Sequence, residues 1–241
     1  MNNFDVIYGF HPILEFIKAR KRKLLKLYTT RPEPNNWSSL KKLVPAHVPI
    51  EYAPRTILTR IAGTDEHQGL VACVSPFGYR SLFFKPESAP LVLMLDGIQD
   101  PRNLGALLRS AYCVGIFGVI ITTKHSSPLT ATAYKASAGL AEHAQIWRAS
   151  SAAQAITELK KAGYSLYVGG FGGTSLEESH FKFPACIIIG AEGAGASAHI
   201  LKAAHIVSLT QQRPDISYNA SVAGGILMYS IAHQLKQEKL A

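Results

Sequence analysis

The stretch LDGIQDPRNLGALLR at residues 95–109 places small and polar residues directly after an apolar run, LVLML at 91–95. Two later stretches repeat this arrangement, IIIGAEGAGAS at 187–197 and ISYNASVAGGILMYS at 216–230. Each stretch predicts the end of a strand, or a loop, that presents backbone and a few side chains to a ligand. Three such stretches in one chain indicate one composite pocket.

From Leu91 onward, apolar runs alternate with segments of helical spacing. The expected strands are LVLML, GVIIT, QIW, SLYVGG, CIIIG and HIVSL, and the expected helices cover 104–114, 131–138, 152–162 and 220–236. Apolar strands interleaved with helices of this length predict an α/β fold with a parallel sheet covered on both faces. Such sheets bind ligands beyond the carboxyl ends of their strands, where all three stretches fall.

The first 75 residues predict a smaller α/β layer. The expected helices cover 11–19, 37–44 and 54–61, and the expected strands cover 24–29, 49–53 and 70–74. Residues 76–90 contain three prolines and no hydrophobic period, so we expect a linker there. The chain therefore divides into a domain at 1–75, a linker at 76–90 and a domain at 91–241.

Composition excludes several protein classes. The apolar runs are far shorter than the roughly 18 residues that a membrane span needs, and the N-terminus does not resemble a secretory signal. Cys73, Cys113 and Cys186 lie among apolar neighbours, which predicts reduced core thiols in a cytoplasmic protein. The nine histidines show no metal-ligand spacing, so we expect no metal site.

Positive charge is concentrated in the first third of the chain. The formal net charge is +9, and residues 1–85 hold 13 Lys and Arg against 6 Asp and Glu. Two interpretations of the densest cluster stay open: a patch that binds the RNA backbone, or a solvated helix end. The cluster comprises Lys18, Arg20, Lys21, Arg22, Lys23 and Lys26.

Two glycine loops follow expected strands, GGFGG at 169–173 and GAEGAG at 190–195. Neither has the G-x-G-x-x-G spacing of dinucleotide-binding folds, and no phosphate-binding P-loop occurs. Glycine lets backbone approach a flat ligand such as adenosine closely, and a plain tight turn is the alternative interpretation.

The three stretches together resemble the signature motifs of the SpoU (TrmH-like) RNA ribose 2′-O-methyltransferases. The matching segments are NLGALLR at 103–109, GAEGAG at 190–195 and SYNASVA at 217–223. IYGFHPILE at 7–15 and HQGLVA at 67–72 resemble the family's RNA-binding extension, which has a ribosomal-protein-like α/β/α fold. The resemblance implies a C-terminal domain with a SPOUT-type trefoil knot, and a homodimer in which both protomers contribute to each site.

The resemblance also implies S-adenosylmethionine as the cofactor. It marks Asn103, Arg109, Glu192 and Asn219 as active-site residues. The cofactor-binding positions it implies are Gly169, Gly170, Phe171, Ile189, Gly190, Glu192, Val207, Leu209, Thr210, Asn219 and Ala220.

The chemistry of each marked residue leaves alternatives. Because a guanidinium stays protonated in proteins, Arg109 is better suited to clamping an RNA phosphate and stabilising a developing oxyanion than to acting as a base. Asn103 and Asn219 each precede or begin a helix, and each is either a capping residue or a ligand contact. Glu192 is expected to pair with Arg109 or with an RNA base edge.

The sequence departs from the family pattern before the third motif. It has LTQQRPD at 209–215 where the family has an I-P-M-x-G-like segment, and Tyr218 stands where the family has leucine. Arg213 in this segment is either a further RNA phosphate contact or the partner of Asp215 in a surface ion pair.

The resemblance implies an RNA substrate, and the N-terminal extension favours ribosomal RNA, specifically a guanosine of 23S rRNA. Two alternatives remain: a tRNA ribose 2′-O-methyltransferase, and a non-catalytic or resistance-type RNA-binding protein that keeps the fold. Cofactor binding distinguishes the last from an enzyme.

Overall fold

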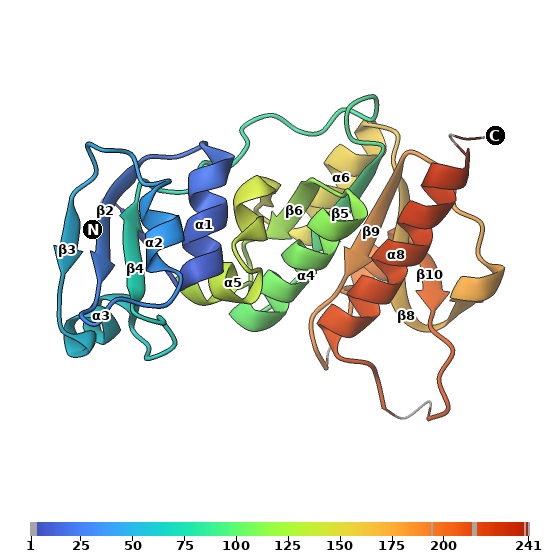
Figure 1. Cartoon of the computed structure of the whole chain (residues 1–241). Helices are drawn as coiled ribbons and strands as arrows, with labels where there is room; N and C mark the ends of the chain where they lie inside the picture. The colour runs from blue at the N-terminus through green and yellow to red at the C-terminus, as the bar shows by residue number, and fades with distance from the viewer. Residues whose placement is uncertain (1–3, 194, 214–215, 239, 241) are drawn as a thin grey trace. The chain divides into compact units, whose positions relative to one another are not determined.

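The computed structural model describes residues 4–193, 195–213, 216–238 and 240, and it divides into two compact units (Figure 1). The first unit comprises Met1–Gly78 together with Leu129–His143, and the second comprises Tyr79–Pro128 together with Ala144–Ala241. The chain therefore enters the second unit, returns to the first for one short segment and then completes the second.

The first unit is built on a four-stranded sheet in the order β1-β4-β2-β3. Its strands are β1 (Asp5–Tyr8), β2 (Leu24–Thr29), β3 (Ile50–Tyr52) and β4 (Leu70–Val74). β4 is antiparallel to both β1 and β2, and β2 is parallel to β3. The predicted strands in this region are confirmed, and β1 is an additional strand that the sequence analysis did not identify.

Three helices of the first unit precede residue 75: α1 (Phe10–Ala19), α2 (Trp37–Lys41) and α3 (Arg55–Ala62). A fourth, α5 (Ala131–Ala136), and the short 3-10 helix η1 (Leu140–His143) come from the inserted segment. α5 packs against β1, and Ala131 contacts the cluster of Tyr8 and Leu58. The sequence analysis placed this helix in the second domain; its apolar face is instead buried in the first unit.

Residues 79–90 are part of the second unit and do not form a free linker. Arg80 donates its backbone N–H to the carbonyl of Ile146 at 2.7 Å and forms a β-bridge with Trp147. Phe84 is buried in the same core cluster as Val92 and Trp147. Phe84, with the partly buried Phe83 beside it, therefore belongs to the core although the segment has no hydrophobic period, and the predicted linker is wrong for residues 79–90.

The second unit contains a six-stranded sheet in the order β10-β8-β9-β5-β6-β7, and all its strand pairs are parallel. The expected parallel α/β sheet is confirmed. The strands are β5 (Leu91–Leu95), β6 (Gly118–Thr122), β7 (Gln145–Ala149), β8 (Ser165–Ser175), β9 (Ala185–Ile189) and β10 (His205–Ser208).

Helices cover both faces of this sheet. On one face α6 (Ala152–Lys161) packs against α7 (Ala198–Ala203), and both contribute to the core that includes Met94 and Ile188. On the other face α4 (Pro101–Val114) packs against α8 (Ala220–Glu238). A Cβ at Gly224 of α8 would lie 2.4 Å from Leu107 of α4, so the close approach of these helices requires glycine.

No helix in the described ranges is both long enough and apolar enough to cross a membrane. Cys73 and Cys186 are buried thiols, as expected, whereas Cys113 is exposed on α4. Burial raises the pKa of both the Cys73 and the Cys186 thiol, so both remain protonated core groups near neutral pH.

Candidate functional site

A cavity of about 500 Å³ lies where β9 and β10 end, and part of the extended β8 also lines it. This is the edge of the sheet at which the sequence predicted a ligand site. Of the predicted cofactor-binding residues, those that line the cavity are Gly169, Gly170, Phe171, Ile189, Gly190, Glu192, Leu209, Asn219 and Ala220.

Two predicted cofactor residues do not line this cavity. Val207 is 2 % exposed within β10, where its side chain is part of the core. Thr210 turns its hydroxyl to the carboxylate of Glu177, to which it donates at 3.2 Å. A backbone contact to a ligand from either residue stays a prediction. Their side chains are engaged within the protein, Val207 in the core and Thr210 with Glu177.

The cavity also includes residues that the sequence analysis did not assign to the cofactor. Six of them lie within the second and third motif segments, and membership of those segments would have indicated them. Leu227 lies farther into the last helix and had no sequence signal. These residues are Ala191, Gly193, Gly195, Gln211, Ser217, Tyr218, Ala223 and Leu227.

The start of α4 leaves Asn103 free for the site. Asp100 caps this helix, accepting the backbone N–H of Arg102 at 2.7 Å, and Pro101 follows it in the first turn. The capping role considered for Asn103 is therefore wrong. Asn103 is 8 % exposed and points its amide toward the loop after β9.

Asn103, Glu192 and Asn219 form one polar cluster, with one residue from each of the three motifs. The Asn103 side-chain amide donates to Oε1 of Glu192. The Asn219 amide donates to the same oxygen at 3.1 Å and to Oδ1 of Asn103 at 3.3 Å. The predicted pairing of Glu192 with Arg109 does not occur within the described part of the chain, where two neutral amides orient the carboxylate. Its contact with an RNA base edge stays a prediction.

Tight turns hold Glu192 at the cavity. The backbone N–H of Gly195 donates to the carbonyl of Ala191 at 2.9 Å, and these two residues form a β-bridge. A Cβ at Gly190 would lie 2.5 Å from the backbone nitrogen of Ala196, so only glycine fits where the chain folds back. The glycine loop thus performs the turn function that was the alternative interpretation, and it lines the cavity as well.

Asn219 both caps α8 and contacts the site. Its Oδ1 accepts the backbone N–H of Ser221 at 2.9 Å and the Ser221 hydroxyl at 2.6 Å. Its amide nitrogen remains directed to Glu192 and Asn103. The capping interpretation of Asn219 is therefore confirmed for its side-chain oxygen. Its amide nitrogen lies in the polar cluster beside the cavity, and its contact with a ligand stays a prediction.

Arg109 does not line the cavity. It is exposed on α4, six residues after Asn103, a separation that places it about 120° away around the helix. No hydrogen bond from Arg109 to another described residue occurs within the chain. The polar cluster and the predicted catalytic arginine thus lie on different faces of α4.

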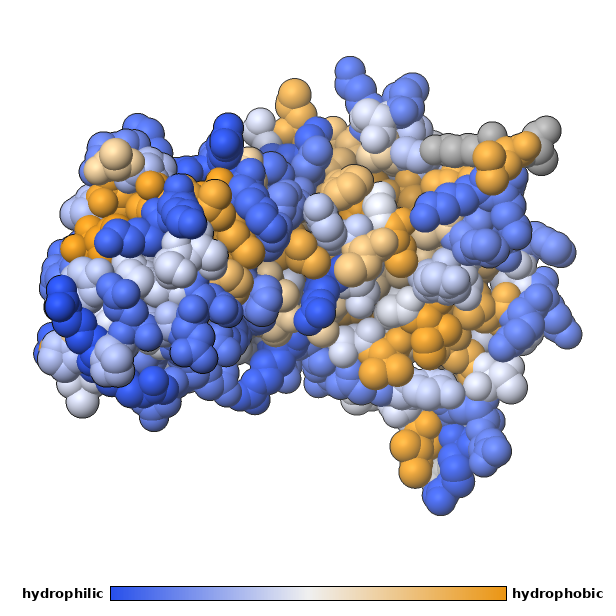
Figure 2. Space-filling view, viewed as in Figure 1, coloured by the Kyte–Doolittle hydropathy of each residue, from blue (hydrophilic) through white to orange (hydrophobic). Residues whose placement is uncertain are grey.

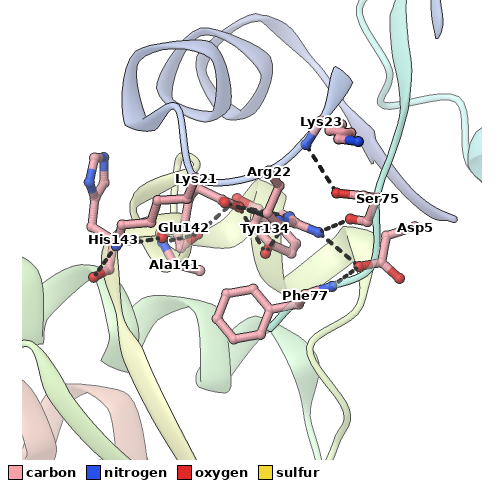
Figure 3. A network of polar contacts seen from close by, with 11 residues as sticks. Asp5, Lys21, Arg22, Lys23, Ser75, Phe77, Tyr134, Ala141, Glu142 and His143 are labelled. Carbon is pink, nitrogen blue, oxygen red and sulfur yellow. Dashed lines mark hydrogen bonds and ion pairs between the residues drawn. The ribbon is translucent and has the colours of Figure 1, made fainter. Parts of the chain in front are cut away.

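The structure divides the predicted basic cluster, and Arg22 is a structural residue. Its side chain is 6 % exposed, and Nη2 donates to Oε2 of Glu142 at 2.7 Å, while Nη1 donates to Oδ2 of Asp5 at 2.9 Å (Figure 3). Burial, and then the charge of Glu142, raise the pKa of Tyr134, whose hydroxyl accepts from Arg22 at 2.7 Å. The prediction that Arg22 binds RNA is wrong, because the N–H groups of its guanidinium already donate to acceptors within the first unit.

The other members of the basic cluster differ in whether their side chains are already bound within the protein. Lys18 pairs with Glu15 at 2.9 Å, and Lys21 donates to the backbone carbonyls of Glu142 and His143. Arg20 and Lys23 are exposed, and no acceptor for their side chains occurs among the described residues. The open cationic surface at this end of α1 is thus smaller than the sequence suggested.

The atypical segment before the third motif is closed by Gln211. Its amide donates to the backbone carbonyls of Arg213 at 2.7 Å and Ile216 at 2.9 Å. Arg213 is exposed and engaged in an interaction, whereas Pro214 and Asp215 lie outside the described residues. The predicted roles of Arg213, in RNA binding or in an ion pair with Asp215, therefore stay predictions.

Among the described residues, no group of three or more His, Cys, Asp or Glu side chains is arranged to hold a metal ion. The polar groups that line the cavity are the carboxylate of Glu192, the amides of Gln211 and Asn219, the hydroxyls of Ser217 and Tyr218, and backbone groups of glycine-rich turns.

Comparison with known protein families gives two matches that together span most of the chain. The SpoU rRNA Methylase family matches residues 90–229. The family described as RNA 2′-O ribose methyltransferase substrate binding matches residues 6–80. The first match contains all three motifs, and the second contains the four-stranded sheet of the first unit.

Curated relatives match over almost the full chain. A putative TrmH family tRNA/rRNA methyltransferase of Bacillus subtilis, YacO, is 32 % identical over 94 % of this chain and 94 % of its own length. An uncharacterized tRNA/rRNA methyltransferase of Mycolicibacterium smegmatis is 32 % identical over 95 % of this chain and 76 % of its own length.

Solved structures share the fold. A structure described as RNA 2′-O ribose methyltransferase superposes with a TM-score of 0.84 at 21 % identity, covering 97 % of this chain and 90 % of that protein. An S-adenosylmethionine-bound rRNA methyltransferase from Sinorhizobium meliloti gives a TM-score of 0.81 at 20 % identity, covering 97 % of this chain and 88 % of that protein.

Proposed function

Because this chain belongs to the SpoU rRNA methylase family, we propose that it transfers a methyl group from S-adenosylmethionine to a ribose 2′-hydroxyl of RNA. The observation that carries the proposal is the convergence of Asn103, Glu192 and Asn219 at a glycine-lined cavity. Methyl transfer to a hydroxyl needs a bound methyl donor and a group that offsets the hydroxyl proton, and the cavity and the Glu192 carboxylate suit these two needs.

The cavity fits S-adenosylmethionine in size and lining. Its volume of about 500 Å³ lies within the range of small-molecule and cofactor sites. Ile189, Leu209 and Leu227 offer apolar contact for an adenine ring, and Gly169 and Gly170 leave backbone groups open to polar contacts. When bound, the cofactor supplies an electrophilic methyl group on its sulfonium.

The protein's task is to position the ribose hydroxyl and to manage its proton. Glu192 is the carboxylate that lines the cavity. The amides of Asn103 and Asn219 fix its Oε1, which leaves Oε2 to accept a hydrogen bond from the hydroxyl. The amides thus hold the carboxylate in one orientation without neutralising its charge.

Arg109 completes the site from a partner protomer. Arg109 is exposed on the outer side of α4, and an adjacent stripe of α8 exposes Val222, Ile226 and Tyr229. Figure 2 shows hydrophobic side chains over the part of α8 that follows the third motif. Burying this stripe in a homodimer brings α4 of one protomer to the cavity of the other, where the guanidinium clamps an RNA phosphate.

A trefoil knot is the remaining structural part of the proposal. The third motif follows β10 and leads into α8, which lies beside the glycine turns after β9. The family resemblance implies that the chain is threaded at this place, and threading would keep the cavity rigid without a large core.

The proposed substrate is a guanosine ribose of 23S rRNA, acted on in the cytoplasm. The match of residues 6–80 to a substrate-binding family supports an RNA substrate. The relatives' names include both tRNA and rRNA, so tRNA is the second candidate substrate. The intact polar cluster argues against a non-catalytic protein, because an RNA-binding protein has no use for a carboxylate held by two amides beside a cavity.

Titration calorimetry with S-adenosylmethionine tests the cofactor assignment. We expect one binding event per protomer, and we expect Ala223→Phe to abolish it, because the larger ring would occupy the cavity next to Leu227. Arg109→Ala is the matched control and should retain binding. A wild-type protein that gives no heat, or an Ala223→Phe variant that binds normally, would overturn the assignment.

A further inference from the structure

We infer that Arg31 and Tyr52 form an exposed stacking platform in the first unit that receives an unpaired nucleobase of the substrate RNA. The inference rests on the proposed function, because it assigns the RNA contact to a surface that neither the motifs nor the basic cluster marked. It depends on the geometry of these two side chains and on the absence of a carboxylate or carbonyl acceptor for Arg31 within the described ranges.

The platform is a stack of two side chains backed by a third. The guanidinium carbon of Arg31 lies 4.4 Å from the centre of the Tyr52 ring. The Trp37 ring meets Tyr52 edge-on, with centroids 6.3 Å apart and planes at 76°. Trp37 is only 2 % exposed, so it anchors the stack from inside the unit, while Arg31 is exposed on the outside.

The Tyr52 ring is fixed by its hydroxyl, which donates to Oε1 of Glu33 at 2.6 Å. This contact raises the pKa of Tyr52, so the hydroxyl remains a donor at neutral pH. The carboxylate also lies beside the platform. Its charge disfavours a phosphate at this place and suits the amino groups on the edges of nucleobases.

The sheet presents these residues at one end. Thr29 and Tyr52 are register partners at the ends of the parallel strands β2 and β3, so the turn at 30–34 and Tyr52 leave the sheet together. Gly69, which directly precedes β4, packs against this turn: a Cβ there would lie 2.8 Å from Cγ of Pro34 and 2.9 Å from the hydroxyl of Thr30. This contact supports the turn, and the turn carries Arg31.

Arg31 is open to a ligand. Unlike Arg22, it has no carboxylate or carbonyl acceptor within the described ranges, and its outer face is exposed. Unpaired RNA bases stack on aromatic rings and guanidinium planes with little sequence preference, whereas bases in a duplex are inaccessible. The platform therefore fits single-stranded RNA, such as a loop or a bulge.

Fluorescence anisotropy of the full chain with a labelled 12-nucleotide oligoadenylate tests the inference. We expect Arg31→Ala to raise the Kd about tenfold. We expect Arg31→Lys to raise it by a similar factor, because lysine keeps the charge but lacks the plane. The same strand annealed to oligouridylate should bind the wild-type protein more weakly.

Lys42→Ala is the matched control, since Lys42 is an exposed cation of the same unit just after α2. We expect it to change the Kd about twofold or less. Normal binding by Arg31→Ala, full rescue by lysine, equal loss in the control, preference for the duplex or no binding of the oligonucleotide by the wild-type protein would each overturn the platform. S-adenosylmethionine affinity and methyl transfer, measured on the same preparations, report separately on the proposed function.

Discussion

At the residue scale, Glu192 shows how a loop carboxylate can be oriented without a cation. Two amides converge on one of its oxygens, and each amide is itself placed by a helix start. A charged partner within the chain would bind the carboxylate more strongly, but it would also compete with a substrate hydroxyl. The arrangement holds the carboxylate in one orientation at the cavity.

Arg109 provides the sharpest test of the catalytic assignment. We expect Arg109→Ala to lower kcat at least about 100-fold, the usual cost of losing a donor to developing charge, while S-adenosylmethionine affinity changes less than about twofold. Arg109→Lys should restore little, because an ammonium lacks the bidentate fork. Lys160→Ala, an exposed cation of α6, serves as the control, and full activity in the lysine variant would show that charge alone suffices.

His67 makes the stability of the first unit dependent on pH. Burial, and then the charge of Arg55, lower the pKa of His67, whose Nδ1 accepts the backbone N–H of Gly69 at 3.0 Å. The unfolded chain therefore takes up a proton near pH 6.5 that the folded chain resists. The contribution of neutral His67 to the free energy of unfolding is therefore complete above the pKa of the unfolded chain. It is lost as the pH falls through the lower pKa that His67 has in the folded protein.

We expect the free energy of unfolding, measured by urea titration, to fall between pH 7 and pH 5. His67→Asn keeps an acceptor for the Gly69 N–H but cannot titrate, so it should flatten this fall. His47→Asn, at an exposed site of the same unit, is the control. A His67→Asn variant with an unchanged pH dependence would contradict the assignment.

At the element scale, α8 has two roles. Its inner face packs on α4 through Gly224, and its outer face exposes Val222, Ile226 and Tyr229 at helical spacing. We expect Ile226→Glu to convert a dimer into a monomer in light scattering, since a carboxylate would be buried at the interface. Lys236→Glu, near the end of the same helix, should remain dimeric. A wild-type monomer would refute the proposed interface.

Strands and helices with a clear hydrophobic period were predictable from sequence, and their limits mostly agree within a few residues. The parallel strands β5, β6 and β9 are continuous apolar runs, which is why they were recognised. β1, which leads directly into α1, and α7, which directly follows the glycine loop at 190–195, were not predicted. The prediction of a linker at 79–90 was wrong because buried residues there, such as Phe84, follow no hydrophobic period.

At the scale of the whole molecule, the Arg22 cluster joins two segments distant in sequence into one unit. Arg22 links Asp5 of β1 to Glu142 of the inserted segment (Figure 3). We expect Arg22→Met to lower the free energy of unfolding of the first unit by about 3–5 kcal/mol, because it leaves Glu142 buried without its cation. Chemical denaturation followed by the fluorescence of Trp37 measures this.

Arg20→Ala is the matched control for Arg22→Met, since Arg20 is an exposed neighbour in sequence, and it should change stability by less than about 0.5 kcal/mol. Equal stability of the Arg22→Met and wild-type proteins would mean that the inserted segment is held by its apolar contacts alone.

The candidate site was predictable to different degrees. Asn103, Glu192 and Asn219 follow strands or begin helices at one edge of the sheet, so their convergence follows from topology. The separation of Arg109 from Asn103 was also predictable, because six residues along one helix place the two side chains about 120° apart. The burial of Arg22 was not predictable, because its acceptor Glu142 lies more than 100 residues away and no local sequence pattern indicates such a pair.

The proposed reaction is tested most directly by identifying the methylated atom. The purified protein is incubated with isotope-labelled S-adenosylmethionine and RNA from cells that lack this gene, and the RNA is then digested to nucleosides for mass spectrometry. We expect labelled 2′-O-methylguanosine from the 23S rRNA fraction and none with Arg109→Ala. Label on a base, or no transfer to RNA by a protein that binds S-adenosylmethionine, would contradict the account.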